Sequence, residues 1–553
     1  MIELLPSALA VALLLSFAEG QHRPVPAVAP PAATSAMPIP YASASTPAQT
    51  LSSALEAVRR KDLNGARALQ ATLSDPVARR VIDWAIIDVL GKALGEAELS
   101  RAVNDFAGWP RPEGRLEALR AAQDAATPAG PVPYSAVAGT TGGGGGFNAL
   151  RLRMNDALKS RDGASAYRII SGHSLRPGSV DYAEAESYAG WLALNKLRDP
   201  RLADMHFLRL EQNVKSPVSK ARAAYWRGRS AEAMGDSARA RAFYEQGAEH
   251  TTTFYGQLSA EKAGRTTLVL TPDPRPAAGD LADFETGELV RALRLLSAAG
   301  ERSLVRVFGL YMGETVETQV ELAMLVDTLR GLGEQEVSLI AYRRGAQRGL
   351  ILHERGYPLL TPPPVYGGAE DAFVLAIVRQ ESQFDPRVRS HADARGMMQL
   401  LPSTARATAS RVGLTWQPER LWEPNYNMQL GSGYLGQMVS NLGGSYVMAA
   451  AGYNAGPGRP VAWVQFCGDP RDPAGDPLDF LECIPFAETR TYVMNVLSNV
   501  QVYRARLNHG HAPLTLASDI RRGVKPTPNL PKGPQPYVPD GPQPYVADPT
   551  ASR

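Results

Sequence analysis

The sequence predicts an all-α protein in which a superhelix of helical hairpins precedes a second helical domain. Apolar residues recur at helical spacing from residue 51 to about residue 360, and helical patterning returns from about residue 364 to 507. The breaks between these stripes are short and carry turn signals such as Asp75-Pro76, Asp199-Pro200 and Gly235-Asp236. About 300 helical residues exceed one ordinary core, so stacked hairpins explain the first region better than a single bundle does.

The composition is that of a globular protein and excludes several classes of function. Apolar residues make up 44% of the 553 residues and charged residues 20%, which is enough for a sizeable core. Lys and Arg number 58 against 55 Asp and Glu, and this near-balance gives no reason to expect a nucleic-acid partner. The two cysteines, Cys467 and Cys483, are too few for a disulfide-rich scaffold, an all-cysteine zinc site or a cysteine-held iron–sulfur cluster.

The N-terminus predicts export. Residues 4–17 form a mostly apolar run too short to span a membrane as a helix, and Ala18-Glu19-Gly20 offers a small-x-small cleavage site. Glu3, with no Lys or Arg beside it, departs from the usual start of a signal peptide. An apolar helix packed on the fold is the alternative, but residues 22–50 hold seven prolines and eight alanines, which is typical of a linker. We therefore predict a signal peptide at 1–20, a linker at 21–50 and no integral membrane segment.

The region 51–360 is predicted to be the α-superhelix. Trp191 and Trp226 lie 35 positions apart, and each precedes a turn and a helix that ends in an aromatic residue. This spacing is typical of a repeated helix-turn-helix unit, whereas an ordinary bundle is the alternative. The run from Gly142 to Gly146 should be a flexible surface loop, because no Lys-Ser or Lys-Thr follows to make it a phosphate loop. At the start of the region four apolar residues follow the i, i+3, i+4, i+7 spacing: Leu51, Ala54, Leu55 and Val58.

The two regions that follow differ in composition. Thr361 to Pro364 ends the superhelix, and the helical region 361–510 has loops rich in Gly, Asn and Tyr, which suits a domain that bears a site. Residues 511–553 hold ten prolines and a near-repeat at 533–548, so we predict a Pro-rich, disordered tail there.

Glu381 is a candidate general acid. Val374, Ile377, Val378 and Glu381 share one helix face, so this carboxyl closes an apolar stripe. Poor solvation raises the pKa of a carboxyl and keeps its proton near neutral pH, as acid catalysis of glycosidic cleavage requires. Pro386 stops the helix soon after, which places Glu381 near the helix end. Taken alone the pattern is weak, because a Glu at a helix rim is usually only solvated.

Three further segments follow in order: Ser390 to Ala405, Ala451 to Gly458, and Ile484 to Val496. Together with Glu381-Ser382 they resemble the motifs of the soluble lytic transglycosylases, periplasmic enzymes that cleave peptidoglycan glycan strands. The resemblance implies a lysozyme-like helical catalytic domain at 361–510. Upstream, Thr253 to Leu258 resembles the local signature of that family's helical superhelix.

The resemblance also implies roles for single residues. Glu381 matches the one catalytic acid/base of the family. Asp393 stands where the family often has Gly, which puts the loop before Gly396 in question, whereas Met397 and Gly452 are smaller departures. The positions that match substrate-binding or cleft-lining residues are Ser382, Ser390, Gly396, Met398, Gln399, Tyr453, Asn454, Glu488 and Tyr492.

A one-carboxylate mechanism follows from the resemblance. Ordinary glycosidases use two carboxylates, but Asp385 is better explained as a turn residue and Glu423 as part of a turn and loop. The family mechanism uses the N-acetyl group of N-acetylmuramic acid to displace the protonated leaving group. Glu381 then takes the proton of the C6 hydroxyl, and a 1,6-anhydro ring closes. No metal or other cofactor is expected, because the eight histidines show no His-x-x-x-His spacing.

Two alternatives to this activity stay open. One is a hydrolytic muramidase that adds water at C1, and the other is an inactive peptidoglycan-binding scaffold. For the active enzyme we expect a periplasmic monomer whose partners are peptidoglycan glycan strands and proteins of the cell-wall machinery.

A disulfide between Cys467 and Cys483 is predicted. The two cysteines bracket a polar segment with three prolines and four aspartates, directly before the motif at 484–496. Closing a loop of about 15 residues contributes roughly 3 kcal/mol in the chain-entropy model, and exported proteins meet an oxidising compartment. Two buried thiols in a cytoplasmic protein are the alternative.

Overall fold

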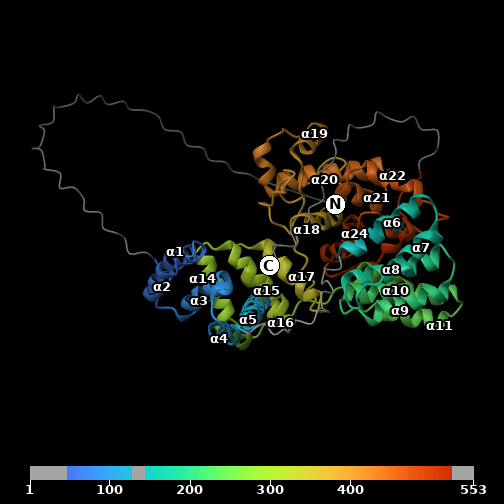
Figure 1. Cartoon of the computed structure of the whole chain (residues 1–553). Helices are drawn as coiled ribbons and strands as arrows, with labels where there is room; N and C mark the ends of the chain where they lie inside the picture. Colours follow the sequence, from blue (N-terminus) through green and yellow to red (C-terminus); the bar gives the residue numbers. More distant parts are fainter. Residues whose placement is uncertain (1–45, 127–143, 526–553) are drawn as a thin grey trace, which may run out of the picture. The chain divides into compact units, whose positions relative to one another are not determined.

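The structure is a computed structural model that describes residues 46–126 and 144–525, which are helical almost throughout (Figure 1). These residues form 25 α-helices, two short 3-10 helices and one two-stranded antiparallel sheet, so the predicted all-α fold class is confirmed. The predicted signal peptide, the linker up to residue 45, Gly142, Gly143 and the tail beyond residue 525 lie outside the described residues. None of the helices in the described ranges is long and apolar enough to cross a membrane.

Two groups of helices from distant parts of the sequence share one core. Apolar residues from both groups meet in one buried cluster, in which Trp84 contacts Phe308 edge to face at a centroid distance of 5.1 Å. Leu51, Ala54, Leu55 and Val58 are all buried in it, as their spacing predicts. The first group is α1 (Pro47–Arg59), α2 (Leu63–Thr72), α3 (Pro76–Leu90), η1 (Gly91–Ala93), α4 (Glu96–Asp105) and α5 (Pro112–Ala126). The second group is α13 (Ala278–Thr286), α14 (Glu288–Ala298), α15 (Arg302–Thr315), α16 (Gln319–Gly331) and α17 (Gln335–Ala346).

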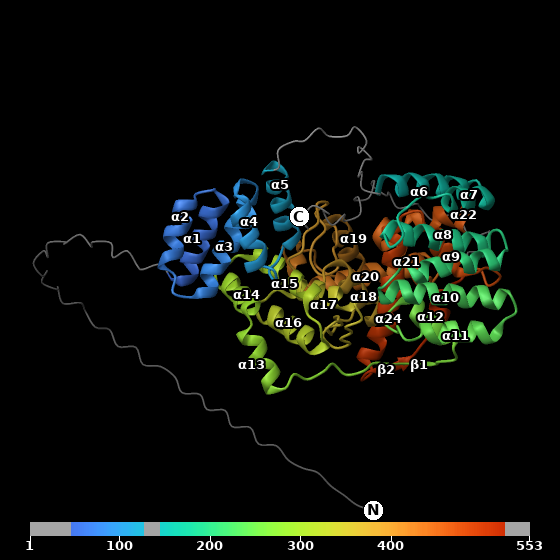
Figure 2. The ribbon, with the colours of Figure 1, turned by 60° about the horizontal axis from the view of Figure 1, so that its bottom comes forward.

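The helices between these groups stack as successive hairpins, which Figure 2 shows side by side. They are α6 (Gly144–Lys159), α7 (Gly163–Ser171), α8 (Val180–Asn195), α9 (Pro200–Gln212), α10 (Pro217–Ala233), α11 (Ser237–Gly247) and α12 (Phe254–Lys262). Gly190 of α8 lies against Phe207 of α9, and Gly228 of α10 lies against Tyr244 of α11. A Cβ atom at these glycines would come within 2.6 Å and 2.4 Å of the rings, so each hairpin needs glycine for its close approach.

Local signals set the ends of these helices. Asp199 and Asp236 are the N-cap residues of α9 and α11, and each carboxylate accepts a hydrogen bond of 3.0 Å from a backbone N–H of the first turn. The prediction of a loop through Gly146 is wrong from Gly144 onward, because these glycines open α6. The helix is fixed by the apolar residues that follow, among them Phe147 and Met154, which are buried.

The region after residue 364 is built around α18 (Asp371–Glu381), which packs against α20 and α24. Residues 372–379 are all buried, so α18 is enclosed on every side rather than on the one face that its apolar stripe predicts. The other helices of this region are α19 (Pro402–Val412), η2 (Pro418–Trp422), α20 (Pro424–Asn441), α21 (Tyr446–Ala455), α22 (Gly458–Cys467), α23 (Pro477–Cys483) and α24 (Ala487–Leu507).

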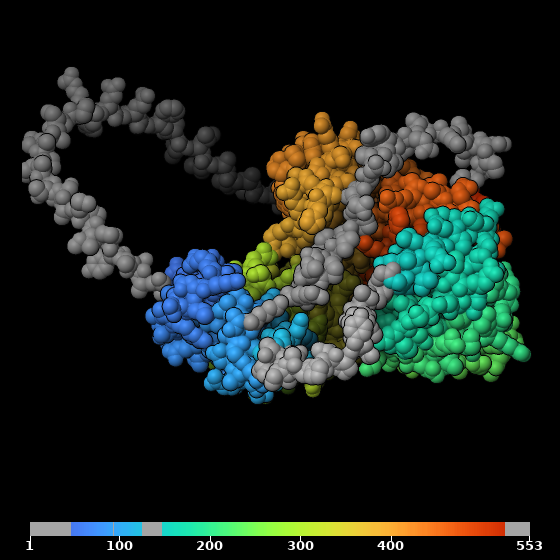
Figure 3. Space-filling model, in the orientation of Figure 1, coloured from blue at the N-terminus to red at the C-terminus, as the bar shows by residue number. Residues whose placement is uncertain are grey.

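Buried charges join the stacked hairpins to α23 and α24, where their surfaces adjoin in Figure 3. The side chain of Glu482 has no exposed surface and accepts hydrogen bonds from Arg222 of α10 at 2.7 Å and from Arg490 of α24 at 3.2 Å. Tyr255 of α12 donates a further hydrogen bond to the same carboxylate. Breaking such a buried cluster is costly, because one missing partner leaves a desolvated charge.

Residues 511–525 are folded, so the prediction of a disordered tail is wrong over this part of 511–553. Strand β2 (His511–Pro513) pairs antiparallel with β1 (Thr267–Val269), and α25 (Leu516–Asp519) follows. Leu514, Leu516 and Ile520 are buried. The prolines that indicate disorder lie almost entirely after residue 525, whereas these three apolar residues anchor the segment that precedes them.

Candidate active site

Glu381 is the last residue of α18, at the point where a fully buried helix reaches the surface. Val374, Ile377 and Val378 have no exposed surface, whereas Glu381 is partly exposed. The helix ends here because Gln383 (φ 52°) is in the left-handed region, as is Phe384 after it (φ 64°), before Pro386 is reached. Such backbone is costly for residues other than glycine and is often found at functional sites.

The carboxyl of Glu381 is held by Tyr492, whose hydroxyl donates a hydrogen bond of 2.6 Å to Oε1. Burial raises the pKa of Glu381 to about 7, and the charge of Glu488 adds to the rise, while the Tyr492 hydrogen bond opposes it. Near neutral pH this group can therefore both donate and accept a proton. The sequence pattern predicts a raised pKa, and the structure supplies its causes.

Tyr453 of α21 lies beside this pair. Its hydroxyl donates a hydrogen bond of 2.7 Å to the carbonyl oxygen of Met398. Burial and the charge of Glu381 raise the pKa of the Tyr453 hydroxyl well above its ordinary value, so it stays protonated. The next residue, Asn454, accepts a hydrogen bond of 2.6 Å from Thr489 of α24. The motifs at 451–458 and 484–496 are thus joined directly.

The loop from Val388 to Leu400 folds back on itself. Gly396 has φ 74°, and a Cβ atom there would lie 2.3 Å from the carbonyl oxygen of Leu421, so only glycine fits. Gln399 Nε2 donates to the carbonyl oxygens of Val388 and Gly396, at 2.9 Å each, which turns this side chain toward its own loop. Ser390 Oγ accepts a hydrogen bond of 3.0 Å from the Ala394 amide.

Asp393 takes a glycine-like backbone conformation, with φ 66°. Its carboxylate accepts hydrogen bonds from Arg389 at 2.6 Å and from Arg395 at 2.9 and 2.7 Å. Asp and Asn tolerate the left-handed region better than most residues. Asp393 therefore keeps the left-handed backbone conformation that a glycine would adopt at this position.

Several predicted substrate-binding side chains lie in the interior. Ser382 is 2% exposed, and its Oγ donates a hydrogen bond of 3.2 Å to the carbonyl oxygen of Val378. Met398 has no exposed surface. These two side chains support the site from behind rather than face a ligand, whereas Glu488 is exposed on the first turn of α24.

The alternative carboxylates are engaged elsewhere. Asp385 accepts hydrogen bonds from the backbone and guanidinium of Arg387, which outweigh burial and leave the pKa of Asp385 lowered. Glu423 is exposed and pairs with Arg420 at 2.8 Å, between η2 and α20. Since both carboxylates are paired with arginines, neither Asp385 nor Glu423 serves as a second carboxylate beside Glu381. Within residues 46–126 and 144–525 no group of three or more His, Cys, Asp or Glu side chains is arranged to hold a metal ion.

Cys467 and Cys483 are joined by a disulfide whose Cα atoms lie 5.4 Å apart. The segment between them is not a poorly packed loop, as its polarity suggests. Its second half is α23, whose Leu478, Phe480 and Leu481 are buried. On the other side of α23, Asp479 accepts a hydrogen bond of 2.9 Å from Trp191.

Asn427 of α20 was not predicted as a site residue, yet it fixes the loop that carries Gly396. It is fully buried, and its Oδ1 accepts a hydrogen bond of 2.8 Å from the Met398 amide. Its Nδ2 donates to the carbonyl oxygens of Arg395 and Leu421 at 2.9 Å each. The signal in the sequence is faint: an amide side chain in a helix that is otherwise largely apolar on that face.

Comparison with protein families matches two parts of this region. The family model described as "Transglycosylase SLT domain" matches residues 366–470, and the one described as "Soluble lytic transglycosylase helical domain" matches residues 483–512. The second match falls on α24 and β2, not on the region 51–360 predicted to be the superhelix.

Relatives with assigned names match the same part of the chain. The soluble lytic murein transglycosylase of Salmonella typhimurium is 39% identical over 137 residues, which are 24% of this chain and 20% of that protein. The membrane-bound lytic murein transglycosylase C of Cronobacter sakazakii is 33% identical over 161 residues, covering 25% of this chain and 43% of that protein. The chain thus spans about a fifth of the length of the soluble curated relative.

The fold extends the likeness over most of the chain. The solved structure of an inactive mutant of the lytic transglycosylase Slt from Pseudomonas aeruginosa superposes with a TM-score of 0.54 at 22% identity, over 87% of this chain and 75% of that one. The region of this chain that carries the motifs therefore matches the transglycosylase SLT domain model and is similar in sequence to soluble lytic murein transglycosylases, as the motifs indicate.

Proposed function

We propose that this chain is a peptidoglycan lytic transglycosylase that cleaves the β-1,4 bond between N-acetylmuramic acid and N-acetylglucosamine. One observation carries the proposal: the partly exposed carboxyl of Glu381, with a pKa of about 7, is held by Tyr492 at the end of a buried helix. A general catalyst works best when its pKa lies near the working pH. The match of residues 366–470 to the transglycosylase SLT domain model supports this class of reaction.

The proposed reaction uses Glu381 twice. As an acid it donates its proton to the glycosidic oxygen, while the N-acetyl carbonyl oxygen of the muramic acid attacks C1. As a base it then takes the proton of the C6 hydroxyl, whose oxygen attacks C1, displaces the N-acetyl carbonyl oxygen from C1 and closes a 1,6-anhydro ring, which leaves the acetamido group intact on C2. Tyr492 stabilises the carboxylate between the two steps through its 2.6 Å hydrogen bond. Water is not consumed.

The glycan strand is proposed to lie along the surface that carries Glu381, bordered by Ser390, Gly396, Gln399, Asn454 and Glu488. Tyr453 contributes through its ring and through its hold on the Met398 carbonyl. We further propose the division into a superhelix at 51–360, serving as a platform for polymer, and a catalytic domain that begins near residue 361. A periplasmic location fits this substrate.

Product analysis tests the proposal. Purified sacculi are digested with the protein, and the muropeptides are examined by mass spectrometry, with Glu381→Gln as the inactive control. Products lighter by one water than hydrolysed muropeptides support a lytic transglycosylase. Hydrated products would instead show a muramidase, and no release by either protein would show an inactive binding scaffold.

A further inference from the structure

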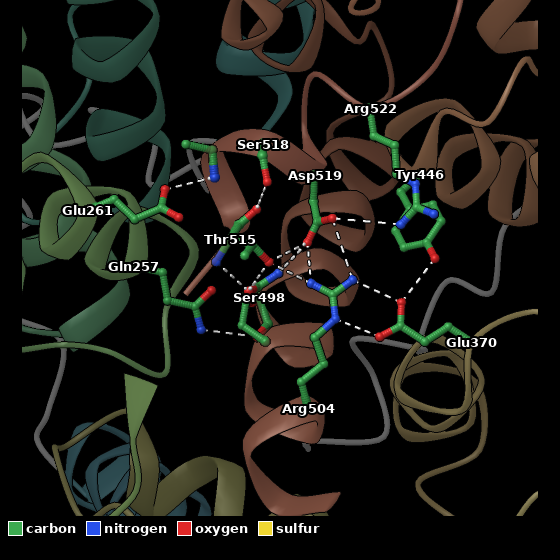
Figure 4. A network of polar contacts seen from close by, with 12 residues as sticks. Gln257, Glu261, Glu370, Tyr446, Ser498, Arg504, Thr515, Ser518, Asp519 and Arg522 are labelled. Carbon is green, nitrogen blue, oxygen red and sulfur yellow. Dashed lines mark hydrogen bonds and ion pairs between the residues drawn. The ribbon is translucent and has the colours of Figure 1, made fainter. Parts of the chain in front are cut away.

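A charged cluster lies at the far ends of the three helices that carry the site (Figure 4). Arg504 of α24 donates two hydrogen bonds to Glu370, at 2.6 and 2.9 Å, and others to Asp519 and Thr515. Tyr446 donates a hydrogen bond of 3.0 Å to Glu370. We call these five residues the Arg504 cluster. Figure 4 shows the guanidinium between the two carboxylates.

Each helix connects this cluster to one residue of the site. Glu370 is the N-cap of α18, which ends at Glu381, about 17 Å away along the helix. Tyr446 opens α21, which carries Tyr453 near its other end. Arg504 lies in the last turn of α24, about 18 Å along the helix from Tyr492. The cluster therefore fixes how the three helices are aligned, and the contacts of Glu381 depend on that alignment.

The segment that completes the cluster lies beyond both family-model matches, which end at residues 470 and 512. Asp519 is nearly buried, and Arg522 stacks over the Tyr446 ring with its guanidinium carbon 4.3 Å from the ring centroid. Helix α12 contacts both this segment and α24: Glu261 accepts a hydrogen bond of 2.8 Å from the Ala517 amide of the segment, and Gln257 donates one of 3.0 Å to the carbonyl oxygen of Ser498 in α24.

We propose that Asp519, through Arg504, is a positioning residue of the active site: the segment 514–522 clamps α18, α21 and α24 so that Tyr492 stays on Glu381. Burial alone would raise the pKa of Glu370, but the hydrogen bonds and charge of Arg504 leave it lowered. Glu370 is therefore charged at neutral pH. Arg504 binds Glu370 and Asp519 at the same time. If Asp519 is lost, the side chain of Arg504 is held by Glu370 alone and can shift together with it.

The direction in which the pKa of Glu381 changes distinguishes a positioning role of Asp519 from a merely structural one. The groups that face Glu381 are Tyr492 and Glu488 of α24 and Tyr453 of α21. Removing the negative charge of Asp519 acts directly by lowering carboxyl pKa values. A loosened Tyr492 hydrogen bond has the opposite effect and moves the pKa of Glu381 upward, because that bond lowers it.

The experiment compares Asp519→Asn with Asp472→Asn in the full chain. Both changes remove one negative charge, and Asp472 pairs with Lys525 at 2.7 Å, outside the Arg504 cluster. Carbon-13 NMR of labelled glutamate carboxyls follows the titration of Glu381, assigned by its loss in Glu381→Gln. The Tyr492→Phe protein, which lacks this hydrogen bond altogether, gives the upper limit for the rise in the pKa of Glu381.

In Asp519→Asn we expect the pKa of Glu381 to rise toward the Tyr492→Phe value. The pKa of Glu261, which the charge of Asp519 helps to raise, should fall in the same sample. The expected change in turnover rests on the proposed function: in Asp519→Asn, kcat should fall about tenfold and KM should change little. Asp472→Asn should match the wild type in every readout.

The NMR readout needs no turnover, so it separates this inference from the proposed function. If Asp519→Asn lowers melting temperature but leaves the pKa of Glu381 unchanged or lower, the segment only stabilises the fold and the proposal is overturned. If Asp519→Asn is too unstable to titrate, Glu370→Gln, which leaves Asp519 on Arg504, is titrated instead. An unchanged Glu381 there also overturns the proposal.

Discussion

Replacing Glu381 by Gln should abolish turnover and at the same time stabilise the protein above neutral pH. The amide has the shape of the carboxyl and can still accept the hydrogen bond of Tyr492, but it cannot donate a proton to a leaving group. Loss of one acid–base catalyst typically costs about 10²–10⁴-fold in rate. The stability gain arises because the folded protein holds an ionised carboxyl in poorly solvated surroundings.

The structure sets the size and pH window of this gain. The pKa of Glu381 is about 7 in the folded protein against an ordinary value of 4.5. An acid with a raised folded-state pKa stabilises the fold fully below its unfolded pKa, and this contribution is lost as pH rises toward the folded pKa. The two values differ by about 2.5, which at 1.36 kcal/mol per unit gives about 3 kcal/mol. Gln carries no such dependence, so the difference between the two proteins is absent near pH 4.5 and complete above pH 7.

Hydrogen exchange of the α18 amides, residues 372–380, measures this locally. At pH 8 the variant should protect these amides up to about 300-fold more than the wild type, and near pH 4.5 the two should agree. Glu261→Gln is the matched control, because the pKa of Glu261 is also raised to about 7 by burial, on α12. It should show a similar stability gain around its own helix while keeping turnover, because the amide oxygen of Gln can still accept the hydrogen bond of the Ala517 amide.

Two results would refute this reasoning. Equal or lower protection of α18 in Glu381→Gln at pH 8 would show that the carboxyl is not poorly solvated. Turnover close to that of the wild type would show that Glu381 is not the acid, whatever its stability.

The remaining predictions concern the contacts around this carboxyl. Tyr492→Phe should raise the pKa of Glu381 in a carbon-13 NMR titration, since it removes a hydrogen bond to the charged form; a fall would contradict the assigned contact. Changing Cys467 and Cys483 to Ser should lower the unfolding free energy by about 3 kcal/mol, and titration of the unreduced wild-type protein should find no free thiol. Glu482→Gln should destabilise the chain by about 3–5 kcal/mol in chemical denaturation, because two guanidinium groups lose their buried acidic partner; a change within experimental error would mean that the cluster is solvated.

The sequence alone predicts the helices and the catalytic carboxyl, because both depend on local patterns. The helix caps at Asp199 and Asp236 need only the residues of the next turn. The place of Glu381 at a helix end follows from an apolar stripe and the proline shortly after it. The chemical role proposed for it rests on motifs whose order along the chain can be read without a structure.

Only the tertiary structure decides what surrounds that carboxyl. The Tyr492 hydrogen bond joins residues 111 positions apart, and no local pattern encodes such a contact. The composition of residues 511–553 indicates disorder, yet residues 511–525 are folded. Strand pairing with β1 and the burial of Leu516 stabilise this part, although the proline-rich composition of 511–553 as a whole predicts a tail. The glycine-like backbone of Asp393 is likewise accommodated by two arginines that the sequence does not single out. Helix ends follow from neighbours in the chain, whereas the pKa of a buried group follows from neighbours in space.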